Sequence, residues 1–414
     1  MVDIAPPGDI AHLGVPETLI LDIVLRRMLR DGQSSTTQLA LDVAVTPYVM
    51  EQALAELRNQ RLIEVLRLDG RNMQVVLTDL GREQAMARVS LCRYTGAVPV
   101  SLSDYDCVVR AQQGRPNVHH DTIRASFTDL VINDALLDEL GPAIRSKGAM
   151  FLYGPPGTGK SSIAERLIRV HGDQVLIPQA VEVDGQIITV FDPVLHKPTV
   201  QPDRIDRRWI LCERPSVIVG GELTASQLDL TFQSNAGIYL APLQMQANNG
   251  ILVIDDFGRQ SVSPEQLLNR WIVPLDRGID YLTLDYGVKF EIPCLTKIVF
   301  STNMEPAHLA DEAFFRRIRS KILIPAMDDA QFDEVLVKVA AHTGVMLAPG
   351  ASERLRQASR QHGDGDVRPY LPAAVCELVV SISEYEGVGP VLDVAMVDRV
   401  VTIFFTQDRA MASD

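Results

Sequence analysis

The sequence predicts an α/β fold in which a parallel sheet carries a glycine-rich loop, with a small helical module in front of it. Three observations lead to this prediction: apolar runs of strand length near 150, 252 and 299, a glycine-rich turn directly after the first run, and amphipathic helical patterns between and after the strands. The 414 residues, 46% of them apolar, are enough for two or three packed domains.

Charge and composition exclude several classes. The formal net charge of −14 disfavours a protein that neutralises many nucleic-acid phosphates. The longest charge-free stretch, 230–254, holds too many amide and hydroxyl side chains for a membrane span, so we expect no span and a cytoplasmic protein. Five widely spaced cysteines predict reduced thiols, and the pair His119 and His120 reads as part of a solvated linker rather than a metal site.

Residues 14–90 predict a compact helical module. Its expected elements are helices at 18–30, 34–42 and 47–60, a hairpin of strands 62–68 and 73–77, and a last helix from Thr78. Thr46 and Pro47 form the start of the third helix, because threonine caps helix N-termini and proline is favoured at the first helical position. This order of elements resembles a winged helix-turn-helix domain.

The partner of this module stays open between DNA and protein. In a DNA-binding winged helix, the helix at 47–60 would enter the major groove. That helix presents Tyr48, Glu51, Gln52, Glu56 and Arg58. Residues 14–90 contain nine arginines, no lysine and ten acidic residues, a net charge of −1 that suits phosphate contacts poorly. A contact with protein, or self-assembly, is therefore favoured over DNA binding. We expect residues 91–124 to form a linker or an extended arm packed on the next domain.

The strongest motif follows the apolar strand 149–153. It is the run Gly154, Pro155, Pro156, Gly157, Thr158, Gly159, Lys160 and Ser161, followed by Ser162 at the start of an amphipathic helix. The pattern is that of a phosphate-binding loop, whose glycines let backbone N–H groups surround the phosphates of a nucleotide. Lys160 adds a positive charge beside the β and γ phosphates, and Ser161 supplies a hydroxyl ligand for magnesium.

Two acidic residues follow the second apolar strand, 251–254. Asp255 is suited to hold Mg²⁺ through its water shell, and Asp256 is suited to orient and polarise the water that attacks the γ-phosphate. Asp256 is one methylene shorter than glutamate.

Three further positions complete the predicted site. Asn303 ends the strand 297–303, so that its amide faces the ligand edge of a parallel sheet. Arg316 and Arg317 close a helix expected over 311–318, where they can stabilise transition-state charge in a neighbouring subunit. Arg368 precedes a long amphipathic helix and is expected to reach the nucleotide from a helical lid.

Together these motifs, in this order, resemble the AAA+ ATPases over residues 125–414. The resemblance implies a five-stranded parallel sheet at 125–325, a helical lid at 326–414, ATP and Mg²⁺ as ligands, and assembly into a ring, often of six subunits. In the terms of that family, Asn303 is sensor 1, Arg316 or Arg317 the arginine finger, and Arg368 sensor 2.

Two insertions narrow the resemblance. Lys160 and Asp255 are 95 residues apart, and the interval contains a hairpin pattern at 180–191 around Asp184 and Gly185. A second hairpin is expected at 281–292. Both insertions are similar to those of the AAA+ branch that contains MoxR-type chaperones and enhancer-binding activators. The loop by which those activators contact a sigma factor is missing from this sequence.

The sequence therefore predicts an ATP-hydrolysing AAA+ ATPase that remodels a protein partner. Two alternatives remain: a DNA-binding transcriptional regulator whose oligomerisation is controlled by nucleotide, and a nucleotide-gated scaffold with little turnover.

Overall fold

The computed structural model describes residues 4–70, 72–114, 118–146, 148–305, 309, 316–362 and 365–405. The chain divides into two compact units. The first consists of Met1–Arg115, His171–Val253 and Gln260–Ile298, and the second of Pro116–Val170, Ile254–Arg259 and Val299–Asp414.

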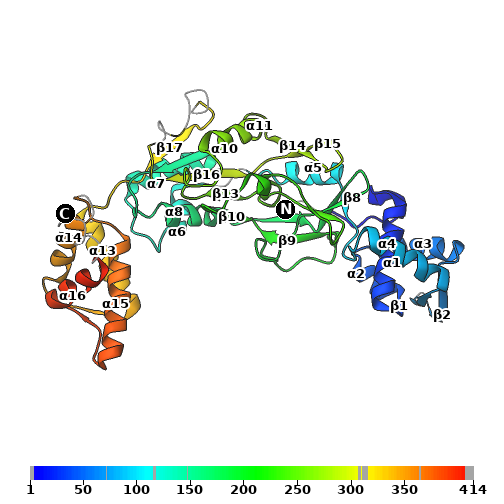
Figure 1. Ribbon diagram of the computed structural model, residues 1–414, viewed down its shortest axis with the longest axis horizontal. Helices are drawn as coiled ribbons and strands as arrows, with labels where there is room; N and C mark the ends of the chain where they lie inside the picture. Colours follow the sequence, from blue (N-terminus) through cyan, green and yellow to red (C-terminus); the bar gives the residue numbers. More distant parts are fainter. Residues whose placement is uncertain are drawn as a thin grey trace. The chain divides into compact units, whose positions relative to one another are not determined.

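The first unit begins with the elements expected for the N-terminal module (Figure 1). They are α1 (Glu17–Asp31), α2 (Thr36–Asp42), α3 (Pro47–Asn59), β2 (Ile63–Asp69), β3 (Asn72–Leu77) and α4 (Asp79–Leu91), with β1 (Ser34–Ser35) paired to β3. Thr46 caps α3 by accepting a hydrogen bond from the backbone of Val49, as its sequence position predicts. The winged-helix interpretation of this order stays a prediction.

The segment after α4 packs into the same unit. It contains β4 (Val100–Ser101), which pairs in parallel with β7 (Ala180–Val183), and α5 (Leu102–Ala111). Tyr105 of α5 is 1% exposed and lies in a core that also contains Trp209. Much of the interval expected as a linker or arm thus contributes to a hydrophobic core.

The remainder of the first unit is rich in β-structure. Its further strands are β6 (Gln174–Pro178), β8 (Gln186–Thr189), β9 (Trp209–Glu213), β11 (Thr231–Gln233), β12 (Ile238–Leu240), β14 (Ile279–Thr283) and β15 (Lys289–Pro293). Both expected hairpins are confirmed, since β7 pairs antiparallel with β8 and β14 with β15. Asp184 and Gly185, both with positive φ, make the first turn, and Tyr286 of the second turn donates a 3.0 Å hydrogen bond to Asp184.

The N-terminal module shares a core with this β-structure. Ala180 and Ile187 of the β7–β8 hairpin lie in the same hydrophobic cluster as the helices of the module. Arg208 and Asp206, each at most 3% exposed, form a 2.8 Å ion pair, and Arg208 also donates to the carbonyl of Leu13. The hydrogen bond from Arg208 to Leu13 thus links the β-structure to the N-terminal segment, and the ion pair with Asp206 holds the Arg208 side chain in place.

A five-stranded sheet carries the phosphate-loop motif. Its order is β10 (Ser216–Val219), β13 (Ile251–Ile254), β16 (Lys297–Thr302), β5 (Met150–Tyr153) and β17 (Ser320–Leu323). The earliest of these strands, β5, lies between the two latest, and it pairs in parallel with both. The predicted α/β fold with a five-stranded parallel sheet is confirmed.

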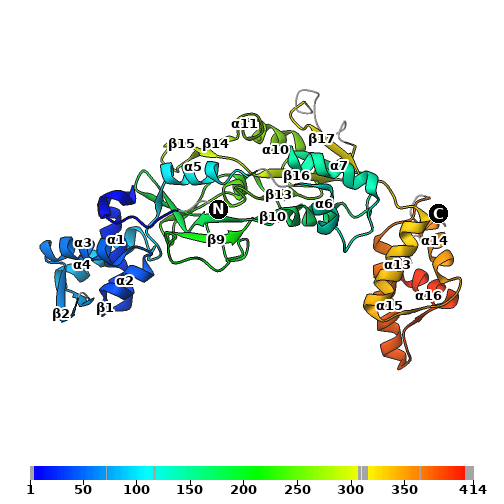
Figure 2. The same ribbon diagram turned by 180° about the vertical axis from the view of Figure 1, so that it is seen from behind.

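The C-terminal part of the second unit is helical, as expected for a lid (Figure 2). It contains α13 (Asp329–Thr343), α14 (Ala351–His362), α15 (Tyr370–Glu386) and α16 (Val394–Phe404), with the short parallel strands β18 (Met346–Leu347) and β19 (Val391–Leu392). These helices pack around their own core, in which Phe332, Leu355 and Val375 are fully buried.

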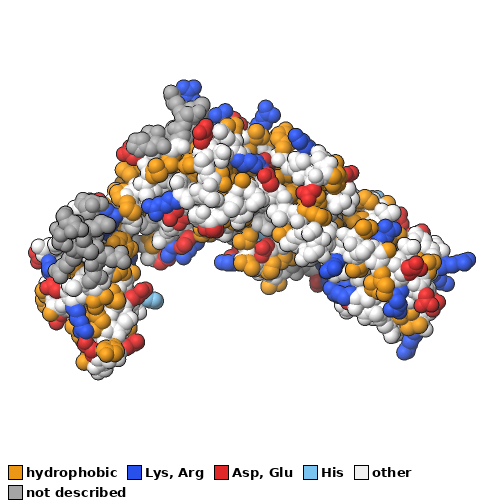
Figure 3. All heavy atoms as spheres, viewed as in Figure 1, with side chains coloured by type: hydrophobic (Ala, Val, Ile, Leu, Met, Phe, Trp, Pro, Cys, Tyr) orange, Lys and Arg blue, Asp and Glu red, His pale blue; other side chains and the backbone are white. Residues whose placement is uncertain are grey.

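No helix in the described part of the chain is both long enough and apolar enough to cross a bilayer. On the face of the N-terminal module seen in Figure 3, basic, acidic and apolar side chains are interspersed.

Candidate nucleotide-binding site

The glycine-rich loop follows β5 directly and leads into α8 (Lys160–Arg166). Gly154 has φ +145°, and a Cβ atom there would lie 2.2 Å from the carbonyl oxygen of Ile324, so no other residue fits this position. Gly159 has φ +88° at the start of α8, a conformation that glycine adopts without steric cost. The sequence therefore folds into a tight loop because its glycines permit both the turn and the close approach of the chain beyond β17.

Lys160 lies inside this loop with 6% of its surface exposed. Its ammonium group donates hydrogen bonds to the carbonyls of Gly154 (3.0 Å) and Pro155 (2.7 Å). Burial lowers the pKa of Lys160 below its ordinary value, and the nearby carboxylates of Asp255 and Asp256 oppose that shift. An anion beside this ammonium would offset the cost of its burial.

The two predicted acidic residues follow β13, which is buried along its whole length. Asp255 accepts a 3.0 Å hydrogen bond from the backbone N–H of Asp256. Asp256 has φ +48°, in the left-handed region that aspartate and asparagine tolerate best among residues with a side chain. The side-chain amide of Asn303, just beyond β16, donates a 3.3 Å hydrogen bond to the Asp256 carboxylate.

Arg368 reaches the loop from the segment before α15. It is 7% exposed and donates a hydrogen bond from its guanidinium to the carbonyl of Pro156. The backbone N–H of Arg368 donates a 3.0 Å hydrogen bond to the hydroxyl of Ser359. The structure thus brings Arg368 next to the phosphate loop.

Arg316 and Arg317 lie in a turn before β17. The helix expected over 311–318 falls largely outside the described residues. Among the residues that the structure describes, neither arginine lines the cavity formed by the phosphate loop. Their role in the site of another subunit stays a prediction.

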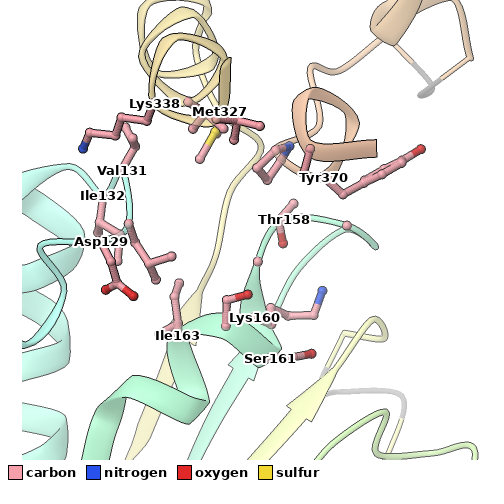
Figure 4. A pocket seen from close by; sticks show the side chains of 18 of the residues that line it. Asp129, Val131, Ile132, Thr158, Lys160, Ser161, Ile163, Met327, Lys338 and Tyr370 are labelled. Carbon is pink, nitrogen blue, oxygen red and sulfur yellow. The ribbon is translucent and has the colours of Figure 1, made fainter. Parts of the chain in front are cut away.

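A cavity of about 500 Å³ joins the phosphate loop, the acidic pair after β13 and Asn303 (Figure 4). Its polar side is formed by Thr158, Lys160, Ser161, Asp255, Asp256 and Asn303. Its other side is mainly apolar and includes Leu130, Val131, Ile132, Met327, Val335, Val339 and Ala373. The volume is in the usual range for a small-molecule site, and the division into an ionic and an apolar side matches the phosphates and the base of a nucleotide.

Sequence reasoning missed the apolar side of the cavity, together with Asp129, Lys338 and Tyr370. Apolar residues that line a ligand have the same pattern as residues of a core, so no sequence signal separates the two. Asp129 is paired with Arg166 (2.9 Å) and Arg169 (2.8 Å) of the helical segment after the loop. These ion pairs fix residues 129–132 beside the phosphate loop, and they lower the pKa of Asp129 against the opposing effect of burial.

The donor set fits a magnesium ion. Ser161 and Asp255 present hydroxyl and carboxylate oxygens to the same cavity, and Mg²⁺ is usually held by one or two such ligands together with phosphate oxygens and waters. Among the described residues, no cluster of three or more His, Cys, Asp or Glu side chains is arranged to hold a metal by itself. Ser161 and Asp255 would hold the ion, which would supply charge neutralisation at the β and γ phosphates.

No protein-family model and no curated protein matches this chain. Among solved structures, it is similar to NtrX from Brucella abortus in complex with ATP, with 14% identity, 66% of this chain and 56% of that chain covered, and a TM-score of 0.41. The complex of NtrX with ADP gives 14% identity, 67% and 57% coverage and a TM-score of 0.40. The chain thus spans little more than half of NtrX.

The chain is also similar to RuvB from Thermotoga maritima, described as a Holliday junction branch migration motor. The identity is 13%, the coverage 70% of this chain and 72% of that chain, and the TM-score 0.37. The chain's own strand order, with the glycine-rich loop after β5, Asp255 and Asp256 after β13 and Asn303 after β16, gives it a parallel α/β fold of the P-loop class.

Proposed function

We propose that this protein binds and hydrolyses ATP as an AAA+ ATPase and uses hydrolysis to remodel a protein partner. One observation carries the proposal: a single cavity is lined by Lys160, Ser161, Asp255, Asp256 and Asn303 and continues into an apolar wall suited to a purine base. These five residues come from three separate strand ends, and their convergence is what phosphoryl transfer to water requires.

Each residue has a distinct proposed role. Lys160 exchanges its two carbonyl partners for oxygens of the β and γ phosphates, and Ser161 and Asp255 hold Mg²⁺. Asp256 orients the attacking water, and Asn303 fixes the direction of the Asp256 carboxylate. Arg368 exchanges the Pro156 carbonyl for a phosphate oxygen.

Arg316 and Arg317 are proposed to act in the site of a neighbouring subunit of a homo-oligomeric ring, with six subunits as the expected number. This assignment rests on their position between Asn303 and β17, and on the resemblance of the motif order to AAA+ ATPases.

For the N-terminal module, we favour a protein partner over DNA. Arg26 is 3% exposed, and Arg27 is paired with Asp31 (2.5 Å) and Asp42 (2.8 Å), so these arginines are engaged within the module. Gln52 of α3, a residue that would face a major groove, is hydrogen-bonded to Asp9 and to the backbone of Ile10. Arg26, Arg27 and Gln52 are therefore not available for phosphate or base contacts.

A second candidate is a nucleotide-gated scaffold with little turnover. Two features of Asp256 favour the scaffold. Its side chain is one methylene shorter than that of glutamate, and its left-handed backbone constrains the direction of its carboxylate. ATP binding without phosphate release would favour the scaffold over the ATPase.

The proposal is tested by measuring ATP binding by calorimetry and phosphate release at steady state, with and without Mg²⁺. The wild type should bind ATP and release phosphate, and Lys160→Ala should do neither, because backbone amides alone do not replace the lost charge. Lys289→Ala, at an exposed position of β15, is the matched control and should equal the wild type. Unchanged ATP affinity in Lys160→Ala would refute the site.

A further inference from the structure

Arg368, two positions before α15, and Tyr370, the first residue of α15, contact two neighbouring residues of the phosphate loop. Arg368 donates to the carbonyl of Pro156. The aromatic ring of Tyr370 lies so close to Gly157 that a Cβ atom at Gly157 would be 2.6 Å from Cδ1 and 2.9 Å from Cε1 of the ring. The ring therefore packs directly on the loop backbone.

The segment that carries these two residues is itself held in place. Ser359 of α14, which is 2% exposed, accepts from the backbone of Arg368 and donates to the carbonyl of Asp366. Val367 forms an antiparallel bridge with Met327, a residue that also lines the cavity. The ring of Tyr370 is thus presented to the loop by a fixed piece of the helical region rather than by a free end.

The contact involves the ring and not the hydroxyl. Tyr370 is 43% exposed, and its hydroxyl points away from the cavity in Figure 4, while the ring carbons lie against Gly157. Gly157 has φ +74°, and its lack of a side chain is what admits the ring. Glycine-rich loops lose much conformational entropy when they order around a ligand, and a ring packed on one side reduces that loss.

We propose that Tyr370 is a positioning residue that holds the phosphate loop in its binding conformation and thereby raises ATP affinity. This inference rests on the proposed nucleotide binding and adds to it a residue outside the motifs. Since the ring belongs to the helical region and Gly157 to the loop after β5, ATP affinity then depends on the docking of the first turn of α15.

The test compares three variants by calorimetric ATP titration and by steady-state hydrolysis. Tyr370→Ala should raise the Kd for ATP about tenfold and leave kcat within about twofold, because the ring orders the ground state and does not touch the reacting groups. Tyr370→Phe should equal the wild type. Tyr385→Ala is the matched control, since Tyr385 lies on the same helix, is 91% exposed and should be silent. Wild-type affinity in Tyr370→Ala, or a loss in Tyr370→Phe as large as in Tyr370→Ala, would overturn the proposal.

A second measurement separates this proposal from the nucleotide-binding proposal itself. Amide hydrogen exchange of residues 154–161, recorded without nucleotide, should be faster in Tyr370→Ala than in the wild type, with exchange in the rest of α8 (162–166) and in α13 unchanged. If the wild type binds no nucleotide, the proposed function fails whatever the exchange result. Unchanged exchange in 154–161 overturns the role of Tyr370 even when the wild type hydrolyses ATP. Tyr370→Leu, which keeps apolar bulk on Gly157, should lie between the wild type and Tyr370→Ala both in ATP affinity and in the exchange of the loop. A loss of ATP affinity in Tyr370→Leu larger than in Tyr370→Ala would also overturn the role of Tyr370.

Discussion

The side-chain amide of Asn303 donates a 3.3 Å hydrogen bond to the carboxylate of Asp256, although 47 positions separate the two residues in the chain. Asp256 stands beyond β13 and Asn303 beyond β16, and these strands are neighbours in the sheet. The carboxylate that we expect to orient the attacking water is therefore itself oriented by a residue from the next strand. This relationship makes the roles of the acidic pair separable by mutation.

Asp256→Asn should leave ATP bound but slow turnover by about two orders of magnitude, the usual contribution of a positioned general base. Asparagine tolerates the left-handed backbone at this position, so the substitution changes the charge and little else. Asp255→Ala should instead weaken the Mg²⁺-dependent part of ATP binding. Calorimetry with and without Mg²⁺, beside phosphate release, distinguishes the two. Hydrolysis at the wild-type rate in Asp256→Asn would mean that another residue positions the water.

Asp256→Glu should not increase hydrolysis, although glutamate is the residue that related ATPases usually carry. The φ of +48° at this position is unfavourable for glutamate, and the longer side chain would lose its hydrogen bond with Asn303. We expect a lower kcat with an unchanged Kd for ATP, measured as phosphate release at saturating ATP. A faster enzyme would show that the reach of the carboxylate, and not its orientation, limits turnover.

Activity should be shared between subunits. An Arg316→Ala, Arg317→Ala double variant retains its own phosphate loop, whereas Lys160→Ala retains its own arginines, and each alone should be inactive. Mixtures of the two should recover part of the ATPase activity, because some interfaces pair an intact loop with intact arginines. Activity against mixing ratio, at concentrations where the wild type oligomerises, is the measurement. If subunits exchange and no mixture has a higher ATPase activity than either variant alone, the arginines act within their own chain or only in folding.

DNA binding by the N-terminal module should be weak, with a Kd above about 10 μM at physiological salt. The full-length protein is the right sample, because Ala180 and Ile187 complete the core of the module. Fluorescence anisotropy of a labelled duplex at two salt concentrations gives both affinity and salt slope. Tight binding with a steep slope would place the DNA-binding regulator ahead of the protein-remodelling ATPase.

The stability of the first unit should fall as the pH drops from about 6.5 to about 4. Burial, and to a smaller extent the neighbouring Arg214, lower the pKa of His171 from 6.5 to about 4. In that interval the unfolded chain takes up a proton that the folded chain does not, so unfolding is favoured as the pH falls. His171→Gln should show a smaller difference in denaturation midpoint between pH 7.5 and pH 5 than the wild type.

His119→Gln, at an exposed position, is the control for this measurement and should behave as the wild type does. Asp173, whose pKa is lowered mainly by its hydrogen bonds with Arg214, titrates in more acidic solution and is common to all three proteins. An equal midpoint difference in His171→Gln and the wild type would assign the acid sensitivity to other groups.

The sequence by itself determined the local chemistry of this protein. The spacing of Gly154, Gly159 and Lys160 requires a loop that closes around phosphates. Glycine is needed for the backbone angles of that loop, and a cation at Lys160 offsets the negative charge of the phosphates. The alternation around Asp184 and Gly185 determined a hairpin for the same kind of reason, since a tight turn between alternating strands restricts which residues can occupy it.

Tertiary structure alone decided which distant residues meet. The strand order sets Asn303 beside Asp256, and the packing of the helical region sets Tyr370 on Gly157, 213 positions away in the chain. The same holds for the apolar wall of the cavity and for the core that joins the N-terminal module to the β7–β8 hairpin. Apolar periodicity predicts that a residue is buried, but it does not predict which residues it packs against, because hydrophobic contacts are not directional.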